Sequence, residues 1–440
     1  MQSAYQNSRR QADHVMVLAF LLLGIGAVVI LRLRIHVEPL LAQIEASGWH
    51  RLVTVASMSL AYLALALMGL RGVLWSRYRP AVVPADEALP RMTVVIPAYN
   101  EGRMVMRSID SAASARYPSD RLEIIVVDDG SKDDTWEYMQ LAAARHPALV
   151  RTVRFVRNQG KRAALAAGFR QARGDVVVTI DSDSIIESET LRAMAAPFAD
   201  PRVGAVAGRV CVLNRAQGLI PRMLHVRYAL SFDFLRAAQS SVGSVYCCPG
   251  ALAGYRMSLV RSLTDRWLGQ RFLGAACAIG EDRAMTNYIL AEGFDAVYQR
   301  SAVVHTLAPT SYQGLCKMFL RWDRSYIREE FRLAGLLAQR PLLPALFIGL
   351  DILSSNAGYL FAYAALLPSV AVIAHHPALA MYLLLGIGVA ASFNALYFLR
   401  IEKSWDCLYG LAYGYYATFA LAWILPYAAM TVRSRGWLTR

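Results

Sequence analysis

The sequence predicts an α/β domain inserted between N- and C-terminal transmembrane helices. Hydrophobic residues make up 56% of the 440 residues and charged residues only 18%, and the uncharged runs gather near the two ends. Between them, short apolar stretches alternate with helical stretches, which is typical of a mostly parallel sheet covered on both faces. This apolar excess excludes a disordered chain. Six cysteines in this length exclude a small disulfide-stapled domain.

Two uncharged runs lie near the N terminus, Val15 to Leu31 and Leu52 to Leu70. Each is near the length needed to cross roughly 30 Å of hydrocarbon as a helix. A signal peptide is the alternative for the first run, but no clear small-residue cleavage site follows it, and a second run comes soon after. Basic residues place both outer ends of the pair in the cytoplasm, and those in the loop between weaken the bias. They are Arg9, Arg10, Arg71, Arg77 and Arg79 against Arg32, Arg34 and Arg51.

The C-terminal region is apolar again, in three runs: Leu342 to Ala374, Ala378 to Leu399 and Cys407 to Val432. Three full crossings would place the basic tail outside, against the positive-inside rule. A re-entrant or twice-crossing last run, broken by Pro426, would keep the tail in the cytoplasm. Such a run hints at a channel, because irregular backbone at membrane depth must be buried in protein or line a cavity. A kinked ordinary span is the alternative.

These runs divide the chain into five segments. Residues 1–79 are expected to hold two transmembrane helices, and residues 80–90 form a linker with three prolines. Residues 91–311 form the cytoplasmic α/β domain, residues 312–340 amphipathic interface helices, and residues 341–440 the C-terminal transmembrane region with a cytoplasmic tail. The predicted location is the cell membrane, the inner or plasma membrane, with several crossings.

Four strands and four helices are expected in the middle of the chain. The strands are Met92 to Ile96, Leu122 to Val127, Arg151 to Val156 and Asp175 to Ile180. The helices that alternate with them are Val105 to Ala115, Trp136 to Ala144, Arg162 to Ala172 and Glu189 to Ala196. Ligands of open α/β sheets bind beyond the carboxyl ends of the strands. The polar residues that follow the strands are therefore the candidate site.

Acidic clusters follow three of these strands. Glu101 comes after the first, Asp129 after the second, and the pair Asp181 and Asp183 after the fourth. One such carboxylate is often only a helix cap. Three clusters at one sheet edge would repel each other unless a cation or a donor-rich ligand lies there. The pattern Asp-x-Asp can hold Mg²⁺ or Mn²⁺ through one or two carboxylates and leave positions for phosphate oxygens.

Three further features suit a phosphate-bearing ligand. Lys161 follows a glycine at a loop-to-helix junction and could meet phosphate, although a solvated basic loop is the alternative. Asp282 begins a helix, either as a cap or as a general base for a sugar hydroxyl. The stretch from Lys317 to Arg328 is basic and amphipathic, as membrane-surface helices are. Nucleic acid is not expected as a partner, because much of the net charge of +14 flanks the membrane spans.

Together these stretches resemble the family 2 glycosyltransferases with a GT-A fold. Within that family they look like the processive membrane synthases: hyaluronan synthase, the rhizobial chitooligosaccharide synthase and, more distantly, chitin and cellulose synthases. The resemblance runs from about Val94 to Glu329, and as a set its motifs are specific. They read VVIPAYNE, VVDDGS, NQGKRAALAAGF, DSDS, VGAVAGRV, CCPGALAGYR, FLGAACAIGEDRAMTNY and RWDRSYIRE, and the final WLTR resembles the C-terminal WGTR of hyaluronan synthases.

The resemblance implies a GT-A (Rossmann-like) fold and a role for each matching residue. It places the uridine pocket at Tyr99, Glu101 and Asp129, nucleotide contact at Lys161, and donor contact at Asp181. It makes Asp183 the ligand of Mg²⁺ or Mn²⁺ and Asp282 the general base. Contacts with the acceptor and the diphosphate are implied for Arg321 and Trp322, and proximity to the acceptor sugar for Cys248 and Gly250. Trp437 and Arg440 would belong to a gate over bound UDP.

The resemblance predicts an inverting, processive β-glycosyltransferase of the membrane. It would build and export a polysaccharide, such as hyaluronan or a chitin oligomer, from UDP-GlcNAc, with or without UDP-GlcA. Met318 stands where the family's Gln-x-x-Arg-Trp motif has glutamine, and Met lacks the amide hydrogen bonds. Glu281 stands where hyaluronan synthases commonly have aspartate. The chitooligosaccharide synthases carry glutamate there, so this residue favours a chito product. A non-processive transferase acting on a lipid or polyprenyl phosphate, and an inactive scaffold, are the alternatives.

Overall fold

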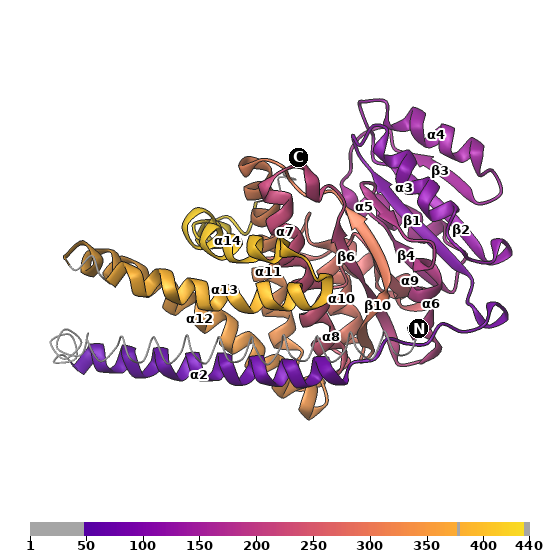
Figure 1. Ribbon diagram of the computed structural model, residues 1–440. Helices are drawn as coiled ribbons and strands as arrows, with labels where there is room; N and C mark the ends of the chain where they lie inside the picture. Colours follow the sequence, from indigo (N-terminus) through magenta and orange to yellow (C-terminus); the bar gives the residue numbers. More distant parts are fainter. Residues whose placement is uncertain (1–47, 376–378, 435–440) are drawn as a thin grey trace. The chain divides into compact units, whose positions relative to one another are not determined.

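The computed structural model describes residues 48–375 and 379–434 (Figure 1). The predicted span from Val15 to Leu31 lies outside the described residues. The chain separates into two compact units. Among the described residues, the helical unit comprises 48–72, 222–230, 349–375 and 379–422, and the α/β unit comprises 73–221, 231–348 and 423–434.

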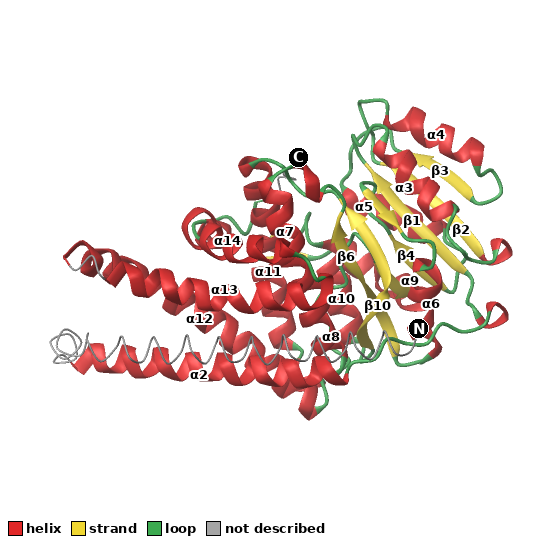
Figure 2. Ribbon diagram, viewed as in Figure 1, coloured by secondary structure: helices red, strands yellow, loops and turns green. Residues whose placement is uncertain are grey.

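An eight-stranded sheet, drawn as yellow arrows in Figure 2, organises the α/β unit. Its order is β3-β2-β1-β4-β7-β6-β10-β5. The first four strands in this order are parallel: β3 (Val150–Arg154), β2 (Leu122–Asp128), β1 (Met92–Ala98) and β4 (Val176–Thr179). They are the four strands that the sequence predicts, each within two residues at both ends. Every residue of β1 is buried, which explains its continuous apolar run.

The second half of the sheet is mixed, where a mostly parallel sheet was expected. Strand β7 (Ala253–Arg256) runs antiparallel to both β4 and β6 (Val203–Val212). Strand β10 (Asp295–Thr306) pairs parallel with β6 and antiparallel with β5 (Ser184–Ile186). The sequence hides β7 because this strand is four residues long and contains Gly254 and Arg256, so it presents no apolar run.

The predicted helices are present, each within two residues at both ends: α3 (Met104–Ala113), α4 (Thr135–Arg145), α5 (Lys161–Gln171) and α6 (Thr190–Ala195). Helix α5 packs on β1 and β2, and α9 (Met257–Leu268) packs on α5 and β7. At Gly168 of α5, a Cβ would lie 2.4 Å from Val95 Cγ1. The helix can therefore approach β1 this closely only because residue 168 has no side chain.

Further helices of the α/β unit come after β6 in the chain. They include α8 (Leu235–Ser240), α10 (Glu281–Ala291) and the long α11 (Tyr312–Gly335), and α7 (Leu219–Ala229) leads from this unit into the helical one. A two-stranded hairpin, β8 (Arg271–Phe272) and β9 (Ala275–Ala276), precedes α10. Helix α10 and helix α11 contact each other. Helix α11 spans most of the segment that the sequence predicts to be amphipathic.

Within the part of the chain that the structure describes, three helices are long and apolar enough to cross a membrane, judged by length and composition. They are α2 (Gly48–Arg77), α12 (Leu342–His375) and α13 (Leu379–Glu402). The last apolar run is broken, as its sequence suggests: α14 (Leu408–Tyr416) and a π-helical turn are followed by α15 (Ile424–Met430), and the bent pair could form a fourth span. Pro426 falls in the first turn of α15, where its missing N–H is tolerated.

One charge of the apolar α12 has a partner in the helical unit. Asp351 forms an ion pair with Arg71 of α2, and both side chains are largely buried. Ionisable groups at membrane depth are expensive unless they are paired. The pair therefore explains how a carboxylate can be present in a helix of this composition.

Replacing Gly168 with Ala should destabilise the α/β unit, because the added methyl would overlap Val95. Overpacking of this kind costs about 1–3 kcal/mol, so the thermal unfolding midpoint in detergent should fall. Gly335→Ala, in helix α11 where nothing lies within 4 Å of the added Cβ, is the matched control. It should leave the midpoint unchanged or raise it. Equal midpoints for the two variants would contradict the packing argument.

Candidate active site

A largely buried lysine joins two carboxylates at the carboxyl end of the parallel strands. Lys161 begins α5, and its Nζ lies 2.5 Å from Asp181 Oδ1, beyond β4, and 2.7 Å from Glu281 Oε1, at the start of α10. Burial opposes the charged ammonium, but the two carboxylates outweigh it and raise the pKa of Lys161. Burial likewise opposes ionisation of Glu281, and Lys161 nevertheless lowers its pKa. The three groups thus form a charged cluster that ties β4, α5 and α10 together.

Asp282 lies next to this cluster, in the first turn of α10. Its Oδ2 accepts a hydrogen bond from the Gly250 N–H at 3.0 Å, and its Oδ1 accepts one from the Arg283 N–H at 2.7 Å. Burial, followed by the negative charge of Glu281, raises the pKa of Asp282. A carboxylate with a raised pKa and fixed orientation is suited to accept a proton.

Gly250 lies against the charged cluster. A Cβ at this position would be 2.8 Å from Lys161 Nζ and 3.3 Å from Glu281 Oε1. Cys248, two residues earlier, is buried, and its N–H donates to Thr286 Oγ1 of α10 at 3.0 Å. The segment from 248 to 250 is therefore fastened to α10 by main-chain donors, and the glycine lets it approach the lysine.

Asp129, beyond β2, is held by the loop that precedes Lys161. Its carboxylate accepts hydrogen bonds from the N–H groups of Gln159 (2.7 Å) and Gly160 (2.9 Å) and from Asn158 Nδ2 (2.9 Å). Burial raises the pKa of Asp129, and the two main-chain donors oppose that rise. Tyr99 and Glu101 follow β1 and are half-buried, and the Glu101 N–H donates to Thr135 Oγ1.

Asp183 is buried beyond β4, and its Oδ1 accepts hydrogen bonds from the hydroxyls of Ser184 and Thr306, each at 3.1 Å. Among residues 48–375 and 379–434 there is no group of three or more His, Cys, Asp or Glu side chains that could hold a metal ion. A cation here would take one protein carboxylate and fill its other positions with ligand oxygens. Mg²⁺ in phosphate sites is commonly bound in this way, so the donor set fits.

Arg321 and Trp322 come from α11. Burial lowers the pKa of Arg321, and the charges of Glu281 and Asp181 oppose that change, which places the guanidinium within electrostatic reach of both carboxylates. Trp322 packs edge-on against Phe319, with ring centroids 5.6 Å apart. Met318 is buried on the same helix.

A pocket brings four of the predicted residues together: Lys161, Asp181, Gly250 and Asp282 line it with Glu281 and seven others. The other lining residues are Pro97, Leu165, Phe169, Thr179, Tyr255, Trp267 and Met285. Tyr99, Glu101, Asp129, Asp183, Cys248, Arg321 and Trp322 do not line this pocket. Trp437 and Arg440 lie outside the described residues.

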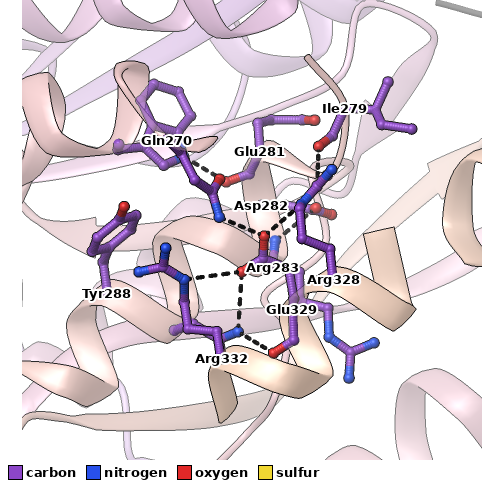
Figure 3. A network of polar contacts seen from close by, with 12 residues as sticks. Gln270, Ile279, Glu281, Asp282, Arg283, Tyr288, Arg328, Glu329 and Arg332 are labelled. Carbon is purple, nitrogen blue, oxygen red and sulfur yellow. Dashed lines mark hydrogen bonds and ion pairs between the residues drawn. The ribbon is translucent and has the colours of Figure 1, made fainter. Parts of the chain in front are cut away.

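A network behind α10 was missed by the sequence analysis (Figure 3). It joins Arg162, Gln270, Arg328 and Glu329 around the loop that leads into α10, at whose start Glu281 and Asp282 lie. Charged residues of a basic amphipathic helix are expected to face solvent, whereas Arg328 and Glu329 are buried. The one available signal is spacing, because Arg321 and Arg328 are seven residues apart and share a helix face.

Comparison with known proteins identifies the family. Residues 93–264 match the family described as Glycosyl transferase family 2. An N-acetylglucosaminyltransferase from Rhizobium sp. (strain N33) is 34% identical over 319 residues, which are 69% of this chain and 68% of that protein. The chain belongs to glycosyl transferase family 2. It is a glycosyltransferase, and the predicted resemblance to the rhizobial enzymes is confirmed.

Two further proteins are similar to this chain. A hyaluronan synthase from Streptococcus pyogenes is 34% identical over 245 residues, covering 54% of this chain and 58% of that enzyme. The structure of the mannosyltransferase PcManGT from Pyrobaculum calidifontis, in complex with GDP-Man and Mn²⁺, has a TM-score of 0.56 at 24% identity. It covers 80% of this chain and 99% of its own. This likeness confirms the predicted GT-A fold of the glycosyltransferase.

Replacing Glu281 with Gln should shift the pH dependence of sugar transfer. The family resemblance implies that Asp282 is the base, and a base works only when ionised, so we expect activity to be lost as the pH falls through the raised pKa of Asp282. Removing the Glu281 charge lowers that pKa, and the acid limb of kcat should therefore move to lower pH. Glu292→Gln, at the exposed far end of α10, is the control and should leave the limb in place. A limb that moves to higher pH in E281Q would contradict the electrostatic assignment.

Proposed function

We propose that this glycosyltransferase is inverting and processive, with a UDP-sugar donor. UDP-GlcNAc, used alone or with UDP-GlcA, would be joined through β-linkages into a chitin oligomer or hyaluronan. The observation that carries the proposal is the pocket in which Asp282 adjoins the Lys161–Asp181–Glu281 cluster. It offers a base and a fixed cation side by side, the two things that displacement of a diphosphate requires. The relatives named as N-acetylglucosaminyltransferase and hyaluronan synthase support the choice of sugar.

In the proposed reaction Asp282 accepts the proton of an acceptor hydroxyl. The hydroxyl oxygen forms a bond to C1 of the donor sugar while the bond from C1 to the diphosphate oxygen breaks, and UDP leaves with that electron pair. A single in-line displacement inverts the anomeric carbon, so an α-linked UDP-sugar gives a β-linked product. The main-chain donors of Gly250 and Arg283 orient the carboxylate for this step.

Positive charge for the leaving diphosphate comes from Lys161 and Arg321, whose charges are already fixed before the donor binds. Asp181 contacts the donor, and Tyr99, Glu101 and Asp129 form the uridine pocket at the ends of β1 and β2. Cys248 and Gly250 lie on the acceptor side with Trp322. Trp437 and Arg440 would close over bound UDP.

Asp183 would hold the Mg²⁺ or Mn²⁺ that the family resemblance implies. When bound, the cation supplies charge neutralisation on the diphosphate. The hydroxyls of Ser184 and Thr306 orient the Asp183 carboxylate for that contact. The Mn²⁺ in the PcManGT complex is in keeping with this choice of ion.

The apolar helices support a multi-pass location in the cell membrane with the catalytic domain in the cytoplasm. On this proposal residues 1–79 and 341–440 anchor the enzyme, residues 91–311 carry catalysis, and α11 lies within the interface segment 312–340. The growing polysaccharide would leave through the C-terminal transmembrane region. A polymer made in the cytoplasm needs such a path, and the broken last run favours an irregular, cavity-lining segment.

One observation favours a second candidate, a non-processive transferase that adds a single sugar to a lipid or polyprenyl phosphate. Met318 is buried on α11 where the processive motif has glutamine. Its thioether cannot make the hydrogen bonds of an amide to an acceptor sugar. The position of Arg321 near the site carboxylates favours the processive enzyme.

The donor is identified by UDP release from the protein in lipid with Mg²⁺ or Mn²⁺, across single UDP-sugars and pairs. Turnover with UDP-GlcNAc alone indicates a chito product, and dependence on added UDP-GlcA indicates hyaluronan. Asp282→Asn should lower kcat by about 10²–10⁴ while UDP binding persists. Turnover only with a supplied lipid acceptor would move the assignment to the second candidate. UDP binding without turnover on any donor would contradict both candidate functions.

Replacing Asp183 with Asn should raise the metal concentration that gives half-maximal UDP release. Loss of a residue that only orients a metal ligand changes metal affinity by roughly ten- to hundredfold. Loss of the proposed ligand itself should raise the required metal concentration by at least that factor. Asp200→Asn, at an exposed aspartate paired with Arg202, is the control and should not change the metal requirement. A wild-type metal requirement in D183N would remove Asp183 from the proposed cation site.

A further inference from the structure

Three successive carbonyls at the start of α10 are held by side chains. Arg328 Nη2 donates to the Ile279 carbonyl, and Arg162 Nη2 donates to those of Ile279 and Gly280, both at 3.4 Å. Trp267 Nε1 donates to the Glu281 carbonyl at 2.9 Å. Asp282, the proposed base, follows directly. The main chain that leads into Asp282 is therefore held in position by the side chains of Arg328, Arg162 and Trp267. Of these three, only Trp267 lines the pocket.

A buried carboxylate completes this arrangement (Figure 3). Glu329 is fully buried, and its Oε1 accepts hydrogen bonds from Gln270 Nε2 at 2.7 Å and from Arg328 Nε at 2.9 Å. Gln270 in turn accepts from Arg162 Nη2 at 2.8 Å. Glu329 thus provides the counter-charge that allows Arg328 to be buried. Arg328 can then donate its hydrogen bond to the Ile279 carbonyl.

The turn itself permits no other residue than glycine. Gly280 has φ of +70°, and a Cβ there would lie 1.8 Å from Ser325 Oγ of α11. Helix α11 therefore packs directly on the turn that begins α10. Arg321, Ser325 and Arg328 follow one another at spacings of four and three residues, so they form one stripe along α11.

The stripe connects two parts of the chemistry. At one end Arg321 is within electrostatic reach of Glu281 and Asp181. Two helical turns later, Arg328 donates to the Ile279 carbonyl, in the main chain just before Asp282. A helix is stiff over two turns because each residue is tied to the next turn by hydrogen bonds. A shift of α11 would move both together.

We propose that Arg328 and Glu329 are positioning residues that seat the base Asp282 relative to Arg321 through the Ile279–Gly280 main chain. This inference rests on the proposed role of Asp282 as base and deepens it. The pair does not touch the substrate; it sets where the base is and how deeply it is buried. Stabilisation of the leaving diphosphate by Arg321 on α11 and proton acceptance by Asp282 on α10 are thereby coupled.

The test compares Arg328→Lys with a matched control, Arg340→Lys. Both arginine side chains are 4% exposed. Arg340 also grips main-chain carbonyls, those of Phe294 (3.0 Å) and Gly243 (3.3 Å), away from the site. Lysine keeps the positive charge in both variants but loses the planar fork that binds a carbonyl and a carboxylate together. Thermal unfolding of both variants checks that R328K and R340K lose a similar amount of stability.

In R328K we expect kcat to fall about tenfold or more, because a displacement near 1 Å at a catalytic group costs up to a hundredfold. The UDP dissociation constant should stay within twofold. A loosened α10 start admits water to Asp282, so the acid limb of kcat should move to lower pH. R340K should keep the wild-type limb and kcat. Glu329→Gln should resemble R328K, because it removes the counter-charge of Arg328.

Two results would overturn the inference while leaving the proposed function intact. One is an active wild-type enzyme whose R328K and R340K variants have the same kcat and pH profile. The other is an R328K variant that loses kcat and UDP binding equally, with its acid limb unmoved. Wild-type enzyme without transfer from any donor is a different outcome, since it contradicts the proposed function itself.

Discussion

The site depends on one largely buried ammonium, that of Lys161. Lys161 is held between Asp181 and Glu281, which belong to the end of β4 and the start of α10. Burial disfavours both a charged ammonium and a charged carboxylate. The two carboxylates hold the charge on Lys161 against its burial, and Lys161 in turn holds the charge on Glu281. The cluster therefore ties the end of β4 and the start of α5 to α10, and among the carboxylates that line the pocket it is Asp282 that has a raised pKa.

Close main-chain approach is the second constraint around this cluster. Gly250 lies against the lysine, and Gly280 lies against Ser325 in a left-handed turn. Side chains at either position would push apart the elements that form the pocket. Main-chain N–H groups then do the orienting: Gly250 and Arg283 for Asp282, Gln159 and Gly160 for Asp129. Groups that are fixed by the fold need little rearrangement when charge develops in a reaction.

The positions of the acidic residues could be predicted because strand ends are visible in the sequence. Apolar runs such as LEIIVV define β2, so Asp129 must follow a strand end, and parallel strands bring such ends to one edge. The same reasoning placed Asp181 beyond β4. It could not find β7, which pairs antiparallel between β4 and β6, because a four-residue strand with a glycine and an arginine has no readable period.

By itself the sequence determined the fold class, the family, the apolar helices and the identity of the candidate catalytic groups. These follow from local patterns: apolar periods, charges that flank spans, and polar residues at strand ends. Only the tertiary structure decided that Lys161 bridges Asp181 and Glu281, and that Arg328 and Glu329 are buried next to the loop that leads into Asp282. Those contacts join residues from 20 to 120 positions apart. Local pattern cannot reveal them, because burial and pairing depend on which faces of α5, α10 and α11 meet when the chain is folded.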